Sequence, residues 1–255
     1  MTGAVLEARG VTKRFGGLVA VAGADLTVSP GEMALVIGPN GAGKTTLFNC
    51  LSGVLAPDEG TVAVAGEDLT GRRSHEFAGG GVSRTFQHAR MFGGLDVVSN
   101  VLVGMHHRLE AGWLRGALRL PSVRAEERAA HDRAMALLDD LGLAHRATDR
   151  VDDLTLHEER RLELARSLIA DPLVLLLDEP FAGLGDDESR TLAGEVNRVR
   201  AERDLAVVLI EHHVELALEL ADHVTVLDFG QVIAHGPPDV IRVDPAVVSA
   251  YMGAA

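Results

Sequence analysis

Gly38-Pro39-Asn40-Gly41-Ala42-Gly43-Lys44-Thr45 matches the phosphate-binding pattern G-x-x-x-x-G-K-[ST], and the residues on either side fit it. The apolar run at residues 33–37 predicts a buried strand entering the turn, and residues 46–51 predict the first turns of a helix leaving it. Glycines let successive backbone N–H groups point into one concavity, and the helix N-terminus adds partial positive charge. We therefore predict a nucleoside triphosphate site. Its expected residues are Gly38, Pro39, Asn40, Gly41, Ala42, Gly43, Lys44, Thr45 and Thr46, with the Lys44 ammonium on the β- and γ-phosphates and the Thr45 hydroxyl on Mg²⁺.

The composition excludes several classes of protein. The 255-residue chain has a formal net charge of -13 and no lysine- or arginine-rich run, which argues against nucleic acid as its main partner. Its lone cysteine, Cys50, excludes an internal disulfide framework, and its apolar helical position predicts a small buried side chain. No stretch of about 18 uncharged apolar residues occurs, and the first residues lack signal-peptide character. We expect any role at a membrane to come through a partner subunit.

The order of the patterns predicts an α/β core interrupted by helices. Short alternating strands are expected up to about residue 30 and again at 60–66. From about 88 to 170 strand patterns vanish and helical spacing appears, most clearly at 124–141, where Gly142 ends the helix.

Two continuous apolar strands, at 173–177 and 205–210, follow that helical region and are separated by a helical stretch at about 188–203. Such strands alternating with helices predict a parallel sheet covered on both faces.

Two carboxylates directly follow the apolar strand at 173–177. Asp178 and Glu179 fall at a strand tip, which is where α/β sheets bind ligands. Asp178 is suited to hold Mg²⁺ through its water shell, and Glu179 to accept a proton from the water that attacks the γ-phosphate. Two acids in a solvated turn are the structural alternative, which the phosphate turn upstream disfavours.

Together these motifs resemble those of the ATP-binding subunits of ABC transporters, closest to the branched-chain amino acid importer type, from about residue 6 to residue 253. Besides the phosphate turn and the two acids, the resemblance is carried by Arg14-Phe15-Gly16-Gly17-Leu18, Arg84-Thr85-Phe86-Gln87-His88, Arg160-Arg161-Leu162-Glu163, Ile210-Glu211-His212 and Tyr251-Met252-Gly253. It implies a single ABC ATP-binding domain over 1–255, with a P-loop (RecA-like) nucleotide core and an antiparallel β subdomain at 1–87 and 171–255. A helical subdomain is then inserted at 88–170.

The resemblance also implies roles for individual residues. Phe15 would stack on the adenine ring, and Gln87 would touch both Mg²⁺ and the attacking water. His212 would contact the γ-phosphate and orient the water. Successive residues at a strand end point in opposite directions, so only one of His212 and His213 can face the nucleotide, and we expect it to be His212.

For the whole assembly the resemblance implies an ATPase that energises a membrane importer, with ATP and Mg²⁺ as cofactors. The expected solutes are branched-chain amino acids or related small polar solutes. The expected partners are a second ABC ATP-binding subunit, most simply in a heterodimer, integral membrane permease subunits, and a periplasmic or lipid-anchored solute-binding protein, with no nucleic acid. The expected location is the cytoplasmic face of the cell membrane, peripheral through partner subunits.

The sequence departs from this family at Leu154-Thr155-Leu156-His157-Glu158, where the usual signature is Leu-Ser-Gly-Gly-Gln. In the family, this signature closes over ATP bound by the opposite subunit of a head-to-tail dimer. Here His157 replaces a glycine, and Glu158 and Glu159 replace neutral glutamines. Thr155-x-x-Glu158 predicts a capping box, and two carboxylates in the first turn of a helix would repel a γ-phosphate. We therefore predict an asymmetric dimer with one degenerate site.

A second departure follows Glu179, where Ala182-Gly183-Leu184-Gly185 carries a glycine in place of the usual Asp or Asn. Three alternatives stay open for the function. The two departures can be tolerated variants with full activity, the subunit can bind ATP with little hydrolysis as a nucleotide-gated device, or the importer can carry urea or amides. A soluble ABC-type switch in repair or translation is disfavoured, because such proteins usually carry two cassettes or long coiled-coil or basic insertions.

Overall fold

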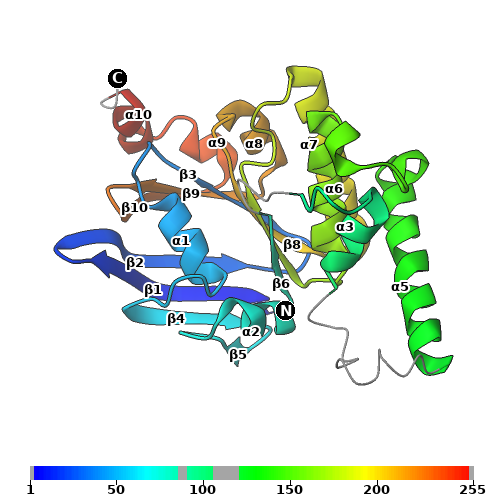
Figure 1. The fold of residues 1–255 in the computed structure, drawn as a ribbon. Helices are drawn as coiled ribbons and strands as arrows, with labels where there is room; N and C mark the ends of the chain where they lie inside the picture. Colours follow the sequence, from blue (N-terminus) through cyan, green and yellow to red (C-terminus); the bar gives the residue numbers. More distant parts are fainter. Residues whose placement is uncertain (1–2, 86–90, 106–120, 253–255) are drawn as a thin grey trace. The chain divides into compact units, whose positions relative to one another are not determined.

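The structure is a computed structural model that describes residues 3–85, 91–105 and 121–252 (Figure 1). The chain divides into a first compact unit, residues 1–87, 173–182 and 193–255, and a second, residues 88–172 and 183–192. The described strands are β1 (Leu6–Phe15), β2 (Leu18–Val28), β3 (Met33–Ile37), β4 (Glu59–Val64), β5 (Glu67–Asp68), β6 (Val82–Arg84), β7 (Val174–Asp178), β8 (Ala206–Ile210), β9 (His223–Asp228) and β10 (Gln231–Gly236). The described helices are α1 (Lys44–Leu51), α2 (Ser74–Gly79), α3 (Val97–Val103), α5 (Pro121–Asp140), α6 (Leu156–Leu168), α7 (Asp186–Arg203), α8 (Val214–Leu220), α9 (Pro238–Ile241) and α10 (Pro245–Met252), with the short 3₁₀ helices η1 (Ala144–Arg146) and η2 (Val151–Asp153).

A mainly parallel sheet forms the centre of the first unit, with the strand order β10-β9-β3-β8-β7-β6. Only the edge strand β10 pairs antiparallel to its neighbour. Every residue of β3, β7 and β8 is buried, because these continuous apolar strands are covered on both faces. The predicted buried strands are confirmed, although β7 and β8 each begin one residue later than expected.

A second, antiparallel sheet in the same unit has the order β2-β1-β4-β5. Leu6 of β1 pairs with Val28 of β2 on one side and with Val64 of β4 on the other. The short strands predicted before residue 30 and at 60–66 are therefore present. With the parallel sheet, they confirm the predicted α/β fold class with its antiparallel β sheet.

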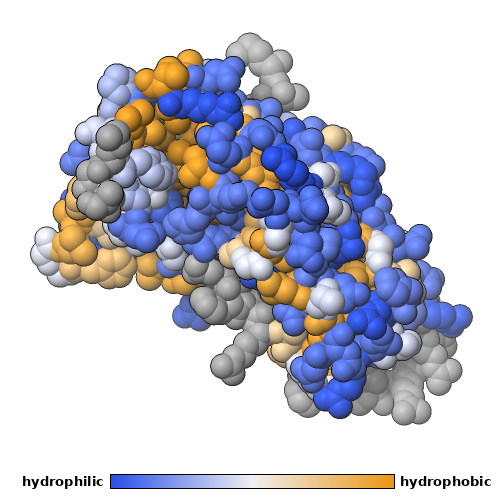
Figure 2. Space-filling view, turned by 90° about the horizontal axis from the view of Figure 1, so that it is seen from above, coloured by the Kyte–Doolittle hydropathy of each residue, from blue (hydrophilic) through white to orange (hydrophobic). Residues whose placement is uncertain are grey.

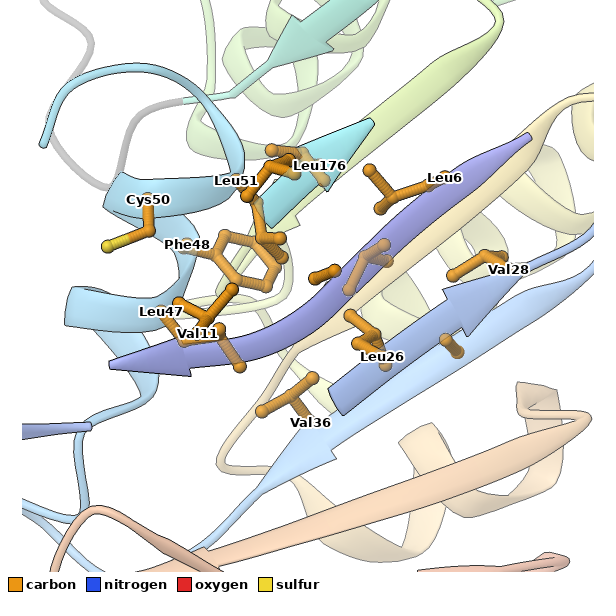
Figure 3. Packing of buried hydrophobic residues seen from close by; sticks show 14 of the residues in the cluster. Leu6, Val11, Leu26, Val28, Val36, Leu47, Phe48, Cys50, Leu51 and Leu176 are labelled. Carbon is orange, nitrogen blue, oxygen red and sulfur yellow. The ribbon is translucent and has the colours of Figure 1, made fainter. Parts of the chain in front are cut away.

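Helix α1 lies between the two sheets and supplies much of the core that joins them (Figure 1). Leu47, Phe48 and Leu51 are fully buried, and Figure 3 shows them pointing from α1 into a cluster with side chains of both sheets. Cys50 is also buried, as predicted, and this burial raises the pKa of its thiol to about 11. The core therefore fixes the helix that begins at the phosphate turn.

The described part of the second unit is helical. The helix predicted at 124–141 is α5, and Gly142 follows it with a φ of 68°, in the left-handed region that commonly ends helices. Helix α3 begins at Asp96, whose carboxylate accepts a hydrogen bond from the Ser99 N–H. Its C-terminal Gly104 lies against α6, because a Cβ there would be 2.1 Å from the Arg166 carbonyl oxygen.

The surface is mixed in character. Figure 2 shows one face that is mostly hydrophilic and carries separate hydrophobic patches. Within the described ranges, no helix combines the length and the apolar character needed to span a bilayer.

Candidate functional site

The phosphate turn ends in an uncapped helix N-terminus. Gly43, the N-cap of α1, has a φ of 103°, its helix receives no side-chain cap, and the first turn contains no acidic residue. A Cβ on Gly43 would lie 2.3 Å from the Ala20 carbonyl oxygen, and a Cβ on Gly38 would lie 2.0 Å from that of Leu227. Only glycine fits these two positions, so the turn can lie close to β2 and β9. The first turn of α1 adds no carboxylate of its own.

Lys44 is held inside this turn. Its Nζ donates hydrogen bonds to the carbonyl oxygens of Gly38 at 2.7 Å and Pro39 at 3.0 Å. Burial lowers the pKa of the Lys44 ammonium, while the negative charges of Glu179 and Asp178 act in the opposite direction. The structure thus brings the predicted cation and the two predicted acids into one electrostatic group.

The tip of β7 presents the two acids in different settings. Asp178 is buried, and its Oδ2 accepts a hydrogen bond from Arg84 Nη2 at 2.8 Å. Glu179 has a φ of 52°, a left-handed conformation that is uncommon for non-glycine residues and occurs at functional sites. Asp178 is therefore fixed by an ion pair, whereas Glu179 projects towards the cavity described below.

His212, which follows β8, reaches Glu179 directly. Its Nε2 lies 2.8 Å from Glu179 Oε1, and half of its side chain is exposed. The buried carboxylate of Glu211 accepts hydrogen bonds from the N–H groups of Phe181, His212 and His213, and so ties together the loops after β7 and β8. Sequence reasoning gave Glu211 no role, because its partner Phe181 lies thirty positions away in the sequence.

An open cavity of about 570 Å³ joins these groups. It is lined by Phe15, residues 18–20, residues 40–46, Glu179, His212, Phe229 and Gly230. Of the predicted residues, His213, Asp178, Gly38 and Pro39 do not line it. Gln87 lies outside the described residues. The structure therefore brings Phe15, the outer part of the phosphate turn, Glu179 and His212 to one cavity in the first unit.

Two features of this site escaped the sequence analysis. Phe229 and Gly230 reach the cavity from the turn between β9 and β10, where no local pattern marks them. Arg84 was quoted only as part of a motif, yet it also donates to Asn49 Oδ1 at 2.7 Å and Ser52 Oγ at 3.0 Å of the α1 region, besides Asp178. It therefore links β6, α1 and the β7 tip.

The donor set suits Mg²⁺ better than a metal held by protein alone. Among the residues that the structure describes, no group of three or more His, Cys, Asp or Glu side chains is placed to hold a metal ion. Magnesium takes few protein ligands and keeps water and phosphate oxygens. The exposed hydroxyl-bearing Thr45 and the carboxylate of Asp178 fit that pattern.

In the second unit, α6 begins with the predicted capping box, which is confirmed. Thr155 Oγ1 accepts from the Glu158 N–H at 3.3 Å, and Glu158 Oε2 accepts from the Thr155 N–H at 2.8 Å. Arg146 Nε also pairs with Glu158 Oε1 at 3.1 Å. The hydrogen bond from Thr155, together with Arg146, holds the pKa of Glu158 below its usual value.

This arrangement adds a partner that the sequence did not reveal in the first turn of α6. The predicted capping box turns the Glu158 carboxylate onto Thr155, and Arg146 also pairs with this carboxylate. The Nε2 atom of His157, at the usual glycine position, is buried without a hydrogen-bond partner. The departure thus consists of an occupied helix end and an imidazole, with Glu159 as the second acid of the first turn.

Comparisons with known proteins agree with this geometry. The ABC transporter family matches residues 21–182, and the family described as branched-chain amino acid ATP-binding cassette transporter matches residues 231–255. The chain is 40% identical over 255 residues to the high-affinity branched-chain amino acid transport ATP-binding proteins BraF of Pseudomonas aeruginosa and LivG of Escherichia coli K12, covering 100% of each chain.

Solved structures give the same result. The ADP conformation of MJ1267, an ATP-binding cassette of an ABC transporter, aligns with a TM-score of 0.86 at 29% identity, over 99% of this chain and 100% of that one. A nucleotide-free cassette from an ABC transporter aligns with a TM-score of 0.84 at 30% identity, over 97% of this chain and 98% of that one.

Proposed function

This chain belongs to the ABC transporter family, together with the branched-chain amino acid transport ATP-binding proteins, and we propose that Glu179, His212 and Gln87 carry its ATP hydrolysis. The ATP-binding subunits of this family are nucleotide-binding ATPases coupled to transport. The observation that carries the proposal is the 2.8 Å contact between His212 Nε2 and Glu179 Oε1 at the edge of a cavity lined by the phosphate turn.

Binding of the triphosphate follows from the turn. The N–H groups at the N-terminus of α1 receive phosphate oxygens, and Lys44 exchanges the carbonyl oxygens of Gly38 and Pro39 for the β- and γ-phosphates. The free face of Phe15, which is 48% exposed, receives the adenine ring. Mg²⁺, when bound through Thr45, Asp178 and Gln87, supplies neutralisation of charge on the phosphate oxygens.

Hydrolysis requires a positioned base. Glu179 accepts the proton of the attacking water, and His212 orients that water and contacts the γ-phosphate. Glu211 positions His212 by accepting its backbone N–H at 2.9 Å. Arg84 holds the carboxylate of Asp178 in place by donating a hydrogen bond to its Oδ2. This chain therefore contributes Glu179 and His212 to the catalytic side of the site, and its motif assigns Gln87 to the same side.

The other half of each site comes from a second ABC ATP-binding subunit, most simply a different chain. Here the α6 N-terminus that would close over the partner's ATP is occupied by its own capping box and carries His157 and Glu159. This supports an asymmetric dimer, in which the site closed by residues 155–159 of this chain binds ATP but turns it over slowly. The alternative hypothesis of a nucleotide-gated subunit, with little hydrolysis at either site, is disfavoured because Glu179 and His212 are both present.

The helical subdomain at 88–170 is proposed to dock on the membrane permease subunits. The support is local: Asn100 is fully buried, accepts a hydrogen bond from the Phe92 N–H at 2.9 Å and donates to the Phe92 carbonyl oxygen at 3.2 Å. The backbone of Phe92 is thus fixed while its ring stays 49% exposed, which suits an interface anchor. This subunit would act at the cytoplasmic face of the membrane through those partners.

The solute follows from the relatives only, since an ATP-binding subunit need not touch it. Branched-chain amino acids are proposed because BraF and LivG are described as transporting them, and urea, amides or other small polar solutes are the alternatives. A periplasmic or lipid-anchored solute-binding protein would complete the importer. Membrane and solute-binding proteins that co-purify with this chain would identify the solute class, and their absence would favour a soluble ABC-type switch.

The decisive experiment disables each catalytic glutamate of the reconstituted complex in turn. Glu179→Gln keeps the shape of the side chain but removes the base, so ATPase and transport should fall about 10²- to 10⁴-fold while ATP binding persists. The same substitution in the partner subunit should have a much smaller effect. If the partner's substitution abolishes turnover and Glu179→Gln does not, the asymmetry is reversed. If neither changes a low single-turnover rate, the nucleotide-gated alternative is correct.

A further inference from the structure

Phe229, in the turn between β9 and β10, has a largely exposed side chain and an unfavourable backbone conformation. Its side chain is 86% exposed, and its φ is 43°. A bulky residue in the left-handed region is an outlier, and such strain concentrates at functional sites. Among the described residues the non-glycine positions with positive φ are Ala65, Asp171, Glu179, Asp204 and Phe229. Glu179 and Phe229 line the same cavity.

Its neighbour Gly230 fixes this turn to the phosphate turn. The Gly230 N–H donates to the Ala42 carbonyl oxygen at 3.0 Å, and the Gly230 carbonyl oxygen accepts from the Ala22 N–H of β2 at 2.8 Å. A Cβ on Gly230 would lie 2.8 Å from the Ala20 carbonyl oxygen, so only glycine allows this close approach. Phe229 is therefore held at a defined place beside the cavity, although its own side chain is solvent-exposed.

Phe15 reaches the same cavity from the end of β1. Lys13 Nζ lies 5.9 Å from the centroid of the Phe15 ring, and it is held there by Asp58 Oδ1 at 3.0 Å and the Ala56 carbonyl oxygen at 2.8 Å. Lys13 thus interacts with the Phe15 ring from a fixed position, while 48% of Phe15 remains exposed. The cavity is therefore lined by two exposed aromatic rings, one at the end of β1 and one in the turn between β9 and β10, and by the phosphate turn.

We propose that Phe229 is a second aromatic contact for the nucleobase, which makes this site prefer purine over pyrimidine nucleotides. The inference rests on the proposed ATP binding in this cavity, and it adds a residue to which neither the sequence motifs nor the comparisons assign a role. Stacking grows with the area of the ring system, so a purine gains more from a second aromatic contact than a pyrimidine does. An apolar ring reads no hydrogen-bonding edge, so ATP and GTP are not separated by it.

The test compares variants of the full chain for binding of ATP, CTP and inorganic tripolyphosphate, by calorimetry in the presence of Mg²⁺. Phe229→Asn removes the ring, and asparagine tolerates a positive φ. A change in affinity can therefore be assigned to the loss of the ring and not to a changed backbone. Its affinity for ATP should fall about five- to tenfold, its affinity for CTP less, and that for tripolyphosphate should not change. Phe229→Tyr should retain the affinity for ATP. Val243→Ala, which removes another exposed apolar side chain away from the cavity, is the matched control and should change nothing.

The outcomes are distinguishable. Equal ATP affinity in Phe229→Asn and the wild type overturns the proposal. An equal loss for ATP and tripolyphosphate also overturns it, because the change would then act through the phosphate turn. If the wild type binds tripolyphosphate and ATP equally well, the cavity receives no base and the inference fails while phosphate binding stands. If it binds none of these ligands, the proposed function itself fails.

Discussion

The N-termini of helices α1 and α6 both present backbone N–H groups, but the side chains around these groups differ. The N-terminus of α1 has a glycine N-cap, no side-chain cap and no acidic residue in its first turn. The N-terminus of α6 has a complete capping box and both Glu158 and Glu159 in its first turn. Free N–H groups and the helix dipole make the first an anion site, whereas at the second the chain supplies its own anion.

The difference predicts that a helix end binds phosphate only where no side chain of the protein occupies its N–H groups. At α1 the nearest charged group is Lys44, whose ammonium bonds two carbonyl oxygens of the turn and can exchange them for phosphate. At α6 the Glu158 carboxylate is bonded to Thr155 and paired with Arg146. A phosphate arriving at the N-terminal N–H groups of α6 would have to displace the capping side chains, whereas no side chain caps those of α1.

The largest effect is expected from removing the cation of the uncapped end. Lys44→Ala should weaken ATP binding about a hundredfold or more, because charge-assisted hydrogen bonds contribute ~1.5–3 kcal/mol each. Arg146→Ala removes the cation next to the capped end and should leave the ATP affinity of the isolated chain unchanged. Calorimetry with ATP measures both. Equal losses in the two variants would contradict the assignment of the phosphate site to α1.

The next experiment makes the uncapped end resemble the capped one. Thr46→Glu places a carboxylate in the first turn of α1, where it would compete with phosphate for the N–H groups and repel it. We expect ATP affinity to fall about ten- to a hundredfold, since a like charge within about 4 Å in a partly solvated site costs a few kcal/mol before relaxation. Thr46→Gln is the neutral control of the same size. Should the two variants bind ATP equally, charge at this helix end does not control binding.

Local patterns predicted the parts of the site that lie within one stretch of chain. The phosphate turn, the strands at 33–37 and 205–210 and the capping box at Thr155 are each decided by residues a few positions apart, and all were found in the sequence. The contacts of Arg84 with Asp178, and of Glu211 with Phe181, join residues 94 and 30 positions apart. No periodicity or spacing encodes such pairs, because tertiary packing brings them together.

The same limit explains why the ion pair at the start of α6 was not predicted. The sequence shows two acids after Thr155, but it does not show that Arg146, twelve positions earlier, lies against one of them. Phe229 is the corresponding case at the nucleotide cavity, since an aromatic residue before a glycine in a hairpin turn carries no signal of its own. Both features depend on where a side chain from another part of the chain lies.

A smaller effect is expected from opening the capped end. Glu158→Ala removes one half of the capping box and the Arg146 pair, and should lower the free energy of unfolding by about 1 kcal/mol at pH 7. The folded-state pKa of Glu158 is held below the ordinary value of 4.5 by Thr155 and Arg146. Its contribution is therefore fully present above about pH 4.5 and is lost as the pH falls through the folded-state value.

Urea unfolding at pH 7 and at acidic pH tests this sign. The stability difference between the wild type and Glu158→Ala should shrink as the pH drops below 4.5. Glu159→Ala, which removes the other acid of the same turn, is the matched variant and should show a smaller difference. A difference that persists unchanged in acid would mean that the Glu158 charge does not stabilise the helix end.

The smallest effect, and the most informative for the asymmetry, is expected from clearing the α6 N-terminus. The triple change His157→Gly, Glu158→Gln and Glu159→Gln removes the two carboxylates and places a glycine in the first turn of α6. In the reconstituted complex the ATPase rate should rise about twofold, because one working site becomes two. The same triple change in a Glu179→Gln background isolates the second site, and there the gain should be a larger fraction of a lower rate. If the triple variant loses activity in both backgrounds, the native residues at 157–159 assist turnover, and the capped helix end contributes to ATP hydrolysis.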